Sequence, residues 1–218
     1  MGQNDTQLGR RLSRAFFQRR SVAVARDLVG CYFTRELDNG ARLVVRLVEV
    51  EAYLGDGSDP ASHAHRGETP RNRTMFGPAG HLYVYRSYGI HFCANIVCTG
   101  KHAAAVLLRA AEPVTGIEAM RRNRALTNGT PDTAILRGPG NFCRALGIST
   151  HDDGLSLLSG PVAVHLPPAR VARPTVLVST RIGLSKAVDL PYRFFVANDP
   201  HVSASKRGMV APRARRGS

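Results

Sequence analysis

The sequence predicts an α+β fold, a single mixed domain built on a mostly antiparallel sheet. Short apolar segments of strand length recur along the chain, tight-turn residues join several of them, and helical spacing is confined to a few short stretches. A chain of 218 residues is long enough to bury one hydrophobic core without disulfides. We expect residues 1–203 to form this domain and residues 204–218 to form a mobile basic tail.

The first elements are predicted to be helices followed by a hairpin. Apolar residues from Gln7 to Asp27 recur at roughly helical spacing with arginines between them, which indicates one or two amphipathic helices. Two strand-like runs, 31–34 and 43–51, then flank Asp38-Asn39-Gly40. Because an Asn-Gly step suits the positive φ angles of a tight turn, these runs are expected to pair as antiparallel strands.

A long polar segment and a second hairpin follow. Residues Gly55 to Gly80 are rich in glycine and proline, and a connection of this length without structure of its own is usually functional. Strands over 82–85 and 90–97 are predicted to close on Arg86-Ser87-Tyr88-Gly89. Further expected elements are a buried strand over 104–110 ending before Glu112-Pro113, a helix from Thr115 to Leu126, and a short helix through Leu146 whose N-terminus can hold a phosphate. Short strands over 162–164 and 176–178, separated by proline-rich turns, precede the segment from Pro191 to Ala197.

The charge of the chain indicates a polyanionic partner. There are 30 lysines and arginines against 16 acidic residues, which gives a net charge of +14 and a pI near 10.7. Such an excess favours nucleic acid through counterion release, and nucleic acid is the leading candidate. The tail adds Lys206, Arg207, Arg213, Arg215 and Arg216.

Membrane and disulfide-stabilised classes are not favoured. No apolar run approaches the ~20 residues that span a bilayer, and residues 1–20 lack a secretion signal. The cysteines occur singly, so we expect buried thiols in a reducing cytosol. The cysteines are Cys31, Cys93, Cys98 and Cys143.

Glu51 is a candidate for chemistry. It ends an apolar strand in which Glu49 shares its face, lies two residues before Tyr53, and leads into the polar segment that carries His63. Catalytic residues often lie where a rigid strand meets a loop, although a solvated carboxylate at a strand end is the plainer alternative. A zinc site on His63, His65 and nearby cysteines is also open, but H-x-H is a weak signal.

Tyr88 is a candidate for insertion into a base stack. It stands beside Gly89 at the predicted apex of the second hairpin, where a large side chain has little protein to pack against. Wedge residues that unstack bases occupy such exposed tips.

Several segments together resemble one known family. They are Val48-Glu49-Val50-Glu51-Ala52-Tyr53-Leu54-Gly55, Asp59 with His63, Thr69-Pro70-Arg71-Asn72-Arg73, Leu82-Tyr83-Val84-Tyr85, Tyr88-Gly89, Phe92-Cys93-Ala94-Asn95, Leu107-Leu108-Arg109-Ala110, Glu112-Pro113 and Gly138-Pro139-Gly140. In combination they look like the alkyladenine (3-methyladenine) DNA glycosylase family, densely over residues 43–113 and more loosely elsewhere. The chain departs from the family pattern at Arg86, Ser87 and His91.

The resemblance implies a curved sheet flanked by helices, a protruding hairpin that inserts into DNA, and a set of catalytic roles. Glu51 would deprotonate the attacking water, and Arg109 would help to hold that water. Tyr53 and Tyr85 would sandwich the flipped base, while His63 would close the pocket and donate a hydrogen bond near the sugar and base.

Further residues are expected to select the base and contact DNA. The amide of Asn95 at the pocket floor would clash with the 2-amino group of guanine, and Tyr88 would enter the minor groove to fill the gap left by the flipped nucleotide. Other DNA contacts are expected at Thr69, Arg71, Arg73 and Gly183.

The expected function is therefore that of a monofunctional DNA glycosylase of base excision repair. It would flip alkylated or deaminated purines (3-methyladenine, with hypoxanthine and ethenoadenine as further candidates) out of double-stranded DNA and hydrolyse the N-glycosidic bond without a metal or cofactor. A lyase needs an amine nucleophile, and the lysines, Lys101, Lys186 and Lys206, lie outside the family motifs. The alternative is a non-catalytic binder of damaged or bent DNA. We expect a cytoplasmic monomer, nucleoid-associated when bound to DNA.

Overall fold

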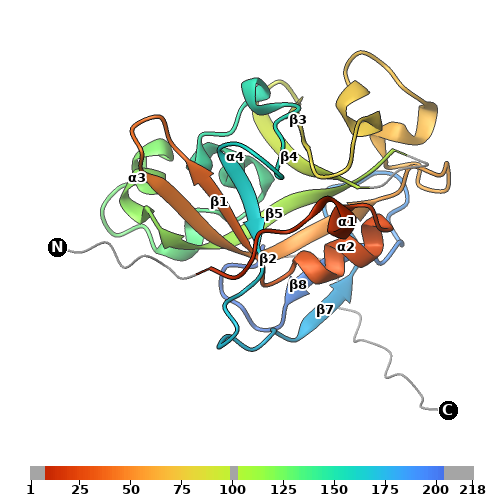
Figure 1. The fold of residues 1–218 in the computed structure, drawn as a ribbon. Helices are drawn as coiled ribbons and strands as arrows, with labels where there is room; N and C mark the ends of the chain where they lie inside the picture. The colour runs from red at the N-terminus through yellow and green to blue at the C-terminus, as the bar shows by residue number, and fades with distance from the viewer. Residues whose placement is uncertain (1–7, 99–102, 204–218) are drawn as a thin grey trace, which may run out of the picture.

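The computed structural model describes residues 8–98 and 103–203 and confirms the α+β class (Figure 1). The strands are β1 (Tyr32–Glu36), β2 (Arg42–Tyr53), β3 (Leu82–Ser87), β4 (His91–Cys98), β5 (Ala104–Thr115), β6 (Val162–His165), β7 (Val176–Ser179) and β8 (Arg193–Val196). The helices are α1 (Arg14–Phe17), α2 (Ser21–Leu28), α3 (Ile117–Asn123) and α4 (Pro139–Leu146), with short 3-10 helices η1 (His63–Arg66), η2 (Arg73–Phe76), η3 (Asp132–Ala134) and η4 (Thr150–Asp152).

The strands form one curled antiparallel sheet of eight strands. The order along the sheet is β3-β4-β5-β2-β1-β6, with β8 also paired to β2 and β7 paired to β8. On the side of β2 away from β5, residues Arg42–Arg46 pair with β1, whereas Glu49–Glu51 pair with β8. The sheet therefore branches at β2, and the stretch that carries Glu51 has a strand on both sides.

Two irregularities interrupt the pairing of β2 with β5 near this branch. The register passes from Leu47 opposite Ala111 to Glu49 opposite Ala110, and then to Val50 opposite Leu108. These shifts leave Arg109 without an opposite residue in β2. Because bulges re-aim side chains and increase local twist, this one accounts for an arginine turned toward the carboxylates of β2.

One face of β2 contributes to the main hydrophobic core. Val48 and Val50 are fully buried in a cluster with Val24 and Leu28 of α2, and with Phe142 of α4. In Figure 1, α2 lies across β2, and α4 lies beside β4 and β5. The alternation predicted for this strand is confirmed, since the glutamates between the valines take no part in the apolar cluster.

A second, smaller cluster lies under the long polar segment. Met75 of η2 and Ala64 of η1 pack with Tyr83 of β3, and Tyr53 and Tyr85 lie against them. The expectation that this segment lacks structure of its own is wrong, because two 3-10 helices and these apolar contacts hold it on the sheet. The segment thereby forms a fixed wall above the tyrosines of β2 and β3.

The second hairpin ends in a tight turn with an aromatic at its apex. Tyr88 and Gly89 have φ angles of 49° and 70°, and the Ile90 N–H donates to the Ser87 carbonyl at 3.0 Å. Positive φ at both central residues with this bond matches a type I′ turn, the form that continues the twist of two strands. Tyr88 is 87% exposed and Ile90 is 72% exposed, so the tip presents two apolar side chains to solvent.

Two predicted boundaries are wrong. The strand expected to stop before Glu112-Pro113 continues as β5 to Thr115. Among the described residues, β5 pairs at Pro113 with β2 on one side and has no partner strand on the other. A proline is tolerated on such a free edge because its missing N–H costs no ladder bond there. The helix expected from Thr115 to Leu126 spans only α3, which follows Gly116 in a left-handed conformation.

Other sequence expectations fall partly outside the described residues. The basic tail predicted for 204–218 lies beyond them, as do residues 1–7. All four cysteines are buried and unpaired, which confirms the expected thiols. In the described ranges there is no helix with the length and apolar character that crossing a bilayer requires.

Candidate active site

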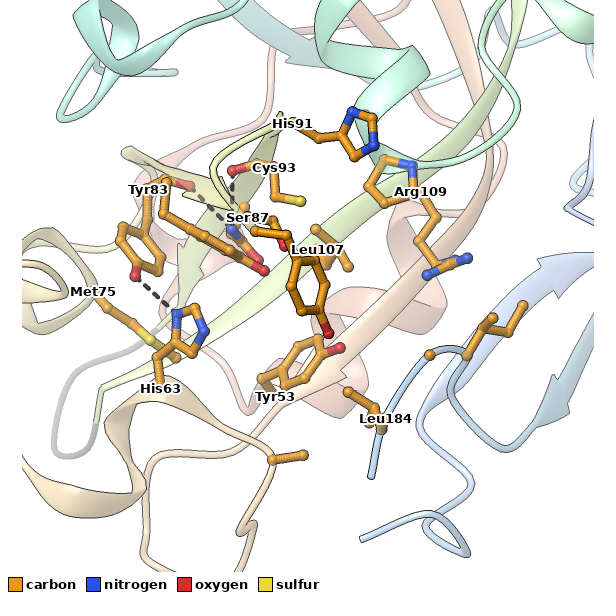
Figure 2. Close-up of a pocket in the computed structure, with 18 of the residues that line it drawn as sticks. Tyr53, His63, Met75, Tyr83, Ser87, His91, Cys93, Leu107, Arg109 and Leu184 are labelled. Atoms are coloured by element: carbon orange, nitrogen blue, oxygen red, sulfur yellow. Dashed lines mark hydrogen bonds between the residues drawn. The ribbon is translucent and has the colours of Figure 1, made fainter. Parts of the chain in front are cut away.

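A cavity of about 610 Å³ lies between the β3–β4 hairpin, the polar segment and the residues that follow β7. Figure 2 shows His63 and Met75 on one side of it, Arg109 and His91 on the other, and Tyr53 between them. The cavity brings together most of the residues predicted for the site, namely Tyr53, His63, Arg71, Tyr85, Tyr88, Asn95, Arg109 and Gly183. Glu51, Thr69 and Arg73 are not among its lining residues.

Glu51 lies directly behind the cavity wall. Its side chain is fully buried, and its Oε1 atom accepts a hydrogen bond from the Ile182 N–H at 2.8 Å. Its Oε2 atom accepts one from the Tyr53 hydroxyl at 2.9 Å, and Arg109 Nη1 is 3.4 Å from Oε1. Each of these three neighbours lines the cavity, so the carboxylate lies directly behind the cavity surface.

Arg109 is held in place by a second buried carboxylate. Glu49 Oε1 accepts hydrogen bonds from Arg109 Nε at 3.1 Å and from Arg193 Nε at 2.6 Å. Glu49 Oε2 accepts from the Ser203 N–H at 2.7 Å. Charge-assisted bonds of this kind fix direction as well as position, so Glu49 leaves Arg109 with its Nη1 atom toward Glu51.

The charges around Glu51 work in opposite directions on its protonation. Burial raises the pKa of Glu51 above the usual value for a carboxyl group. The Arg109 charge, the Ile182 N–H and the Tyr53 hydroxyl lower this pKa, while the negative charge of Glu49 adds to the rise. Burial and the nearby Glu51 also raise the pKa of Tyr53, so its hydroxyl keeps its proton and donates.

A buried ion pair between Arg181 and Asp59 lies against the ring of Tyr53. Arg181 Nη1 and Nη2 each lie 2.7 Å from a different oxygen of Asp59, and both side chains are fully buried. The Arg181 guanidinium stands 4.5 Å from the centre of the Tyr53 ring. Asp59 also accepts the N–H of Leu54 at 3.1 Å. The pair thus ties the end of β2 to the polar segment and to the residues after β7.

His63 belongs to an aromatic group at the other end of the cavity. Its Nδ1 atom is 2.9 Å from the Tyr83 hydroxyl (Figure 2). Its ring packs edge to face against the Tyr85 ring, with 4.5 Å between the ring centroids. Burial and the Arg71 charge lower the pKa of His63, so the neutral imidazole prevails at neutral pH. A neutral ring can donate from one nitrogen and accept at the other.

Asn95 lies deep in the cavity with its amide already oriented. The side chain is buried, and Nδ2 donates to the backbone carbonyl of Tyr83 at 3.1 Å. The amide is therefore fixed in direction against the floor formed by β3 and β4.

The residues predicted to contact DNA lie around the cavity mouth or on the polar segment. Arg71 donates to the Arg86 carbonyl at 3.0 Å, which links the polar segment to the hairpin. Gly183 lines the cavity with a positive φ of 76°. Thr69 bonds Asn72 within its own turn, and Arg73 is an exposed side chain 3.4 Å from Glu68.

The weaker zinc alternative has no supporting geometry. No group of three or more histidine, cysteine or acidic side chains in the described ranges is placed to hold a metal ion. His63 is instead directed at Tyr83.

Comparisons with known proteins decide the family. The family model described as methylpurine-DNA glycosylase matches residues 15–200. A protein of Agrobacterium fabrum is 49% identical over 191 residues, 87% of this chain and 91% of the relative, and one of Methanoculleus marisnigri is 46% identical over 197 residues, 88% and 98%. Both carry the name "Putative 3-methyladenine DNA glycosylase".

The chain belongs to the methylpurine-DNA glycosylase family. Membership makes it a DNA glycosylase, a hydrolase of N-glycosyl bonds that acts in DNA repair, and makes DNA its partner. The family suggested by the sequence motifs is therefore confirmed.

Some supporting residues of this candidate site were not predicted from the sequence. Arg181, Ile182 and Arg193 come from a region without periodic pattern, yet they contact Asp59, Glu51 and Glu49 respectively. The one signal was the pair of glutamates two residues apart on a strand. A strand face that buries two carboxylates needs cations from elsewhere in the chain, and the arginines of β5 and β8 supply them.

Proposed function

We propose that this glycosylase is monofunctional, and that it flips an alkylated or deaminated purine into the cavity and hydrolyses its N-glycosidic bond with water activated by Glu51. The observation that carries the proposal is the fully buried Glu51 carboxylate behind a wall of Tyr53, Arg109 and Ile182. The wall encloses a cavity lined by tyrosines, as a flipped base requires.

The proposed chemistry follows from the charge of Glu51. Breaking the bond between base and sugar builds positive charge on the sugar, which a nearby carboxylate stabilises while it accepts a proton from water. The Arg109 guanidinium, 3.4 Å from Glu51, favours the ionised carboxylate and offers donors that hold the attacking water. Glu49 keeps this guanidinium in place.

Base recognition is assigned to the cavity walls. Tyr53 and Tyr85 would stack on the two faces of the flipped base, and a cationic alkylated ring gains cation–π attraction there. His63 would close the pocket with a hydrogen bond near the sugar and base. Asn95, fixed by its bond to the Tyr83 carbonyl, would exclude the 2-amino group of guanine. We propose 3-methyladenine as the main lesion class, with hypoxanthine and ethenoadenine as further candidates.

DNA binding is assigned to the hairpin and its surroundings. Tyr88 at the exposed apex would enter the minor groove and fill the space left by the flipped nucleotide. Arg71, which joins the polar segment to the hairpin, would contact DNA at the cavity mouth. Thr69, Arg73 and Gly183 complete the proposed contacts.

Hydrolysis is favoured over a lyase reaction by the placement of amines. A lyase forms a Schiff base between an amine and the sugar. Residues 8–98 and 103–203 contain a single lysine, Lys186, whose exposed side chain does not line the cavity. The remaining lysines, Lys101 and Lys206, lie outside those residues.

A lesion panel tests the proposal. The purified chain is incubated in EDTA with duplexes that contain 3-methyladenine, hypoxanthine or ethenoadenine, and strands are separated with and without alkali. The expected result is cleavage that depends on alkali, because a monofunctional enzyme leaves an intact abasic site. Absence of abasic sites on every lesion would contradict the proposed substrates, and strand breaks without alkali would contradict the hydrolytic mechanism.

Replacing the proposed wedge should weaken flipping more than chemistry. In Tyr88→Ala the ring that offsets the unstacking cost is lost, so flipping should fall roughly tenfold, given that stacking contributes about 1–3 kcal/mol per base. The measurement is the fluorescence rise of a 2-aminopurine placed beside the lesion. Tyr88→Phe keeps the ring and should flip normally, while unchanged flipping in Tyr88→Ala would rule out the wedge role.

A further inference from the structure

Tyr53 has two ends in different environments. Its ring lines the cavity, where a flipped base would stack. Its hydroxyl group points into the protein and donates to Glu51 Oε2 at 2.9 Å. One side chain therefore connects the proposed base-binding surface to the proposed catalytic carboxylate.

We propose that the hydroxyl group of Tyr53 is a positioning group for Glu51, which fixes the direction of one carboxylate oxygen and favours the ionised form of that carboxylate. This inference rests on the proposed role of Glu51 as the base that activates water. It gives Tyr53 a second task, distinct from stacking and carried by a single oxygen atom.

The arrangement of donors around Glu51 makes this hydroxyl group difficult to replace. The Ile182 N–H bonds Oε1, and the Arg109 contact at 3.4 Å is also to Oε1. Among the recorded contacts of the described residues, Tyr53 supplies the donor to Oε2. A fully buried carboxylate ionises readily only when donors replace the lost water, so removal of this donor acts directly on its charge.

The Tyr53 ring is held so that the hydroxyl group keeps its direction. The Arg181 guanidinium lies 4.5 Å from the ring centre, and Arg181 is itself fixed by two bonds to Asp59. The residue after Arg181 provides the N–H that bonds the other oxygen of Glu51. The same support therefore sets both donors to the carboxylate.

The other ionisable groups near Glu51 come from each neighbouring element. They are Glu49 and Tyr53 on β2, Tyr85 on β3, Cys93 on β4, Arg109 on β5, Arg193 on β8 through Glu49, and Arg181 after β7. Arg193 acts on Glu51 only through its bond to Glu49. Of the two cavity tyrosines on β2 and β3, Tyr53 is the one whose hydroxyl bonds Glu51.

Tyr53→Phe removes this one oxygen atom and keeps the ring. Loss of a donor to the ionised form raises the pKa of Glu51, and the reaction needs the ionised form, so the rate should fall at a higher pH than in the wild type. We expect the acidic limb of the single-turnover rate to move upward by about one pH unit, the size of a lost hydrogen bond to a charged group. An unmoved limb would overturn the inference.

Tyr85→Phe is the matched control. It also removes a phenol oxygen from the cavity wall, but Glu51 Oε2 accepts from Tyr53 and not from Tyr85, so the acidic limb of Tyr85→Phe should stay at the wild-type pH whatever its rate. A shift of equal size in both variants would show that any lost hydroxyl perturbs the profile, and would contradict a specific role for Tyr53. Thermal melts of both variants check that each is folded at the pH values used.

A titration without substrate separates this inference from the proposed function. In protein labelled with ¹³C glutamate, the carboxyl signal missing from Glu51→Gln identifies Glu51, and its midpoint should move to higher pH in Tyr53→Phe. If Glu51→Gln keeps full activity, the proposed function fails, and the NMR midpoint still decides the positioning role. If Glu51→Gln is inactive and neither the midpoint nor the limb moves in Tyr53→Phe, the inference fails alone.

Discussion

Glu51→Gln is expected to abolish base release while leaving binding to lesion-containing DNA intact. The amide cannot accept the proton from water or stabilise the positive sugar, and loss of a general base typically lowers the rate by about 10²–10⁴-fold. A group that acts in the transition state changes rate rather than affinity. The measurements are the single-turnover rate and the dissociation constant for the same duplex.

The fold should tolerate this substitution. A glutamine oxygen can accept from the Ile182 N–H, and its amide nitrogen can donate to the Tyr53 hydroxyl. Because burial raises the pKa of Glu51, its ionised form costs stability at neutral pH, and the variant should melt at the wild-type temperature or above it. Such an exchange of activity for stability is common at active sites.

Glu112→Gln is the control for Glu51→Gln. Glu112 lies on β5 in an ion pair with Arg46 at a partly exposed position, and it does not line the cavity. Its neutralisation should leave the rate nearly unchanged. If Glu51→Gln kept a rate comparable to that of Glu112→Gln, a group other than Glu51 would supply the catalysis, and the proposed mechanism would be wrong.

Of the substitutions considered, Asp59→Asn should lower the free energy of unfolding the most. Asp59 and Arg181 are fully buried and joined by two bonds of 2.7 Å, and the substitution leaves the arginine charge uncompensated. Breaking a buried pair in this way costs about 3–5 kcal/mol, a large fraction of the stability of a typical domain. The free energy of unfolding from urea titration, monitored by circular dichroism, gives the loss directly.

A surface ion pair provides the comparison for Asp59→Asn. Asp132 pairs with Arg121 at 2.8 Å but is about half exposed, so Asp132→Asn should change stability by less than about 1 kcal/mol. The double variant Asp59→Asn with Arg181→Met removes both charges and should lose less than the sum of the single variants. Equal losses in Asp59→Asn and Asp132→Asn would mean that the buried pair does not stabilise the site.

Much of the fold could be predicted from local patterns in the sequence. The alternation of Glu49 and Glu51 with valines predicted the faces of β2 because a period of two depends only on neighbouring residues. The Asn39-Gly40 step predicted the first hairpin for the same reason. Pro113 misled the prediction of β5, since proline ends a strand in the middle of a sheet but is tolerated at a free edge.

The supporting parts of the site depend on pairing that no local pattern contains. Arg109 faces Glu51 because the register of β2 and β5 shifts around it, and such a shift is a property of two strands together. Arg181 follows β7 in a stretch rich in bends, and its place beside Asp59 is set by the curl of the sheet rather than by its own sequence. The motifs therefore indicated the residues that line the cavity better than those that hold them.

At Tyr88 the residue that best suits the left-handed backbone of the turn differs from the residue that presents an aromatic ring at its tip. In the described chain Tyr88 is the aromatic residue with a positive φ, a conformation that costs a non-glycine residue about 1–2 kcal/mol. Asparagine adopts this conformation with less strain, so Tyr88→Asn would stabilise the β-turn and remove the ring from the tip. A substitution chosen to raise the thermal stability of this turn would thereby remove the proposed wedge residue.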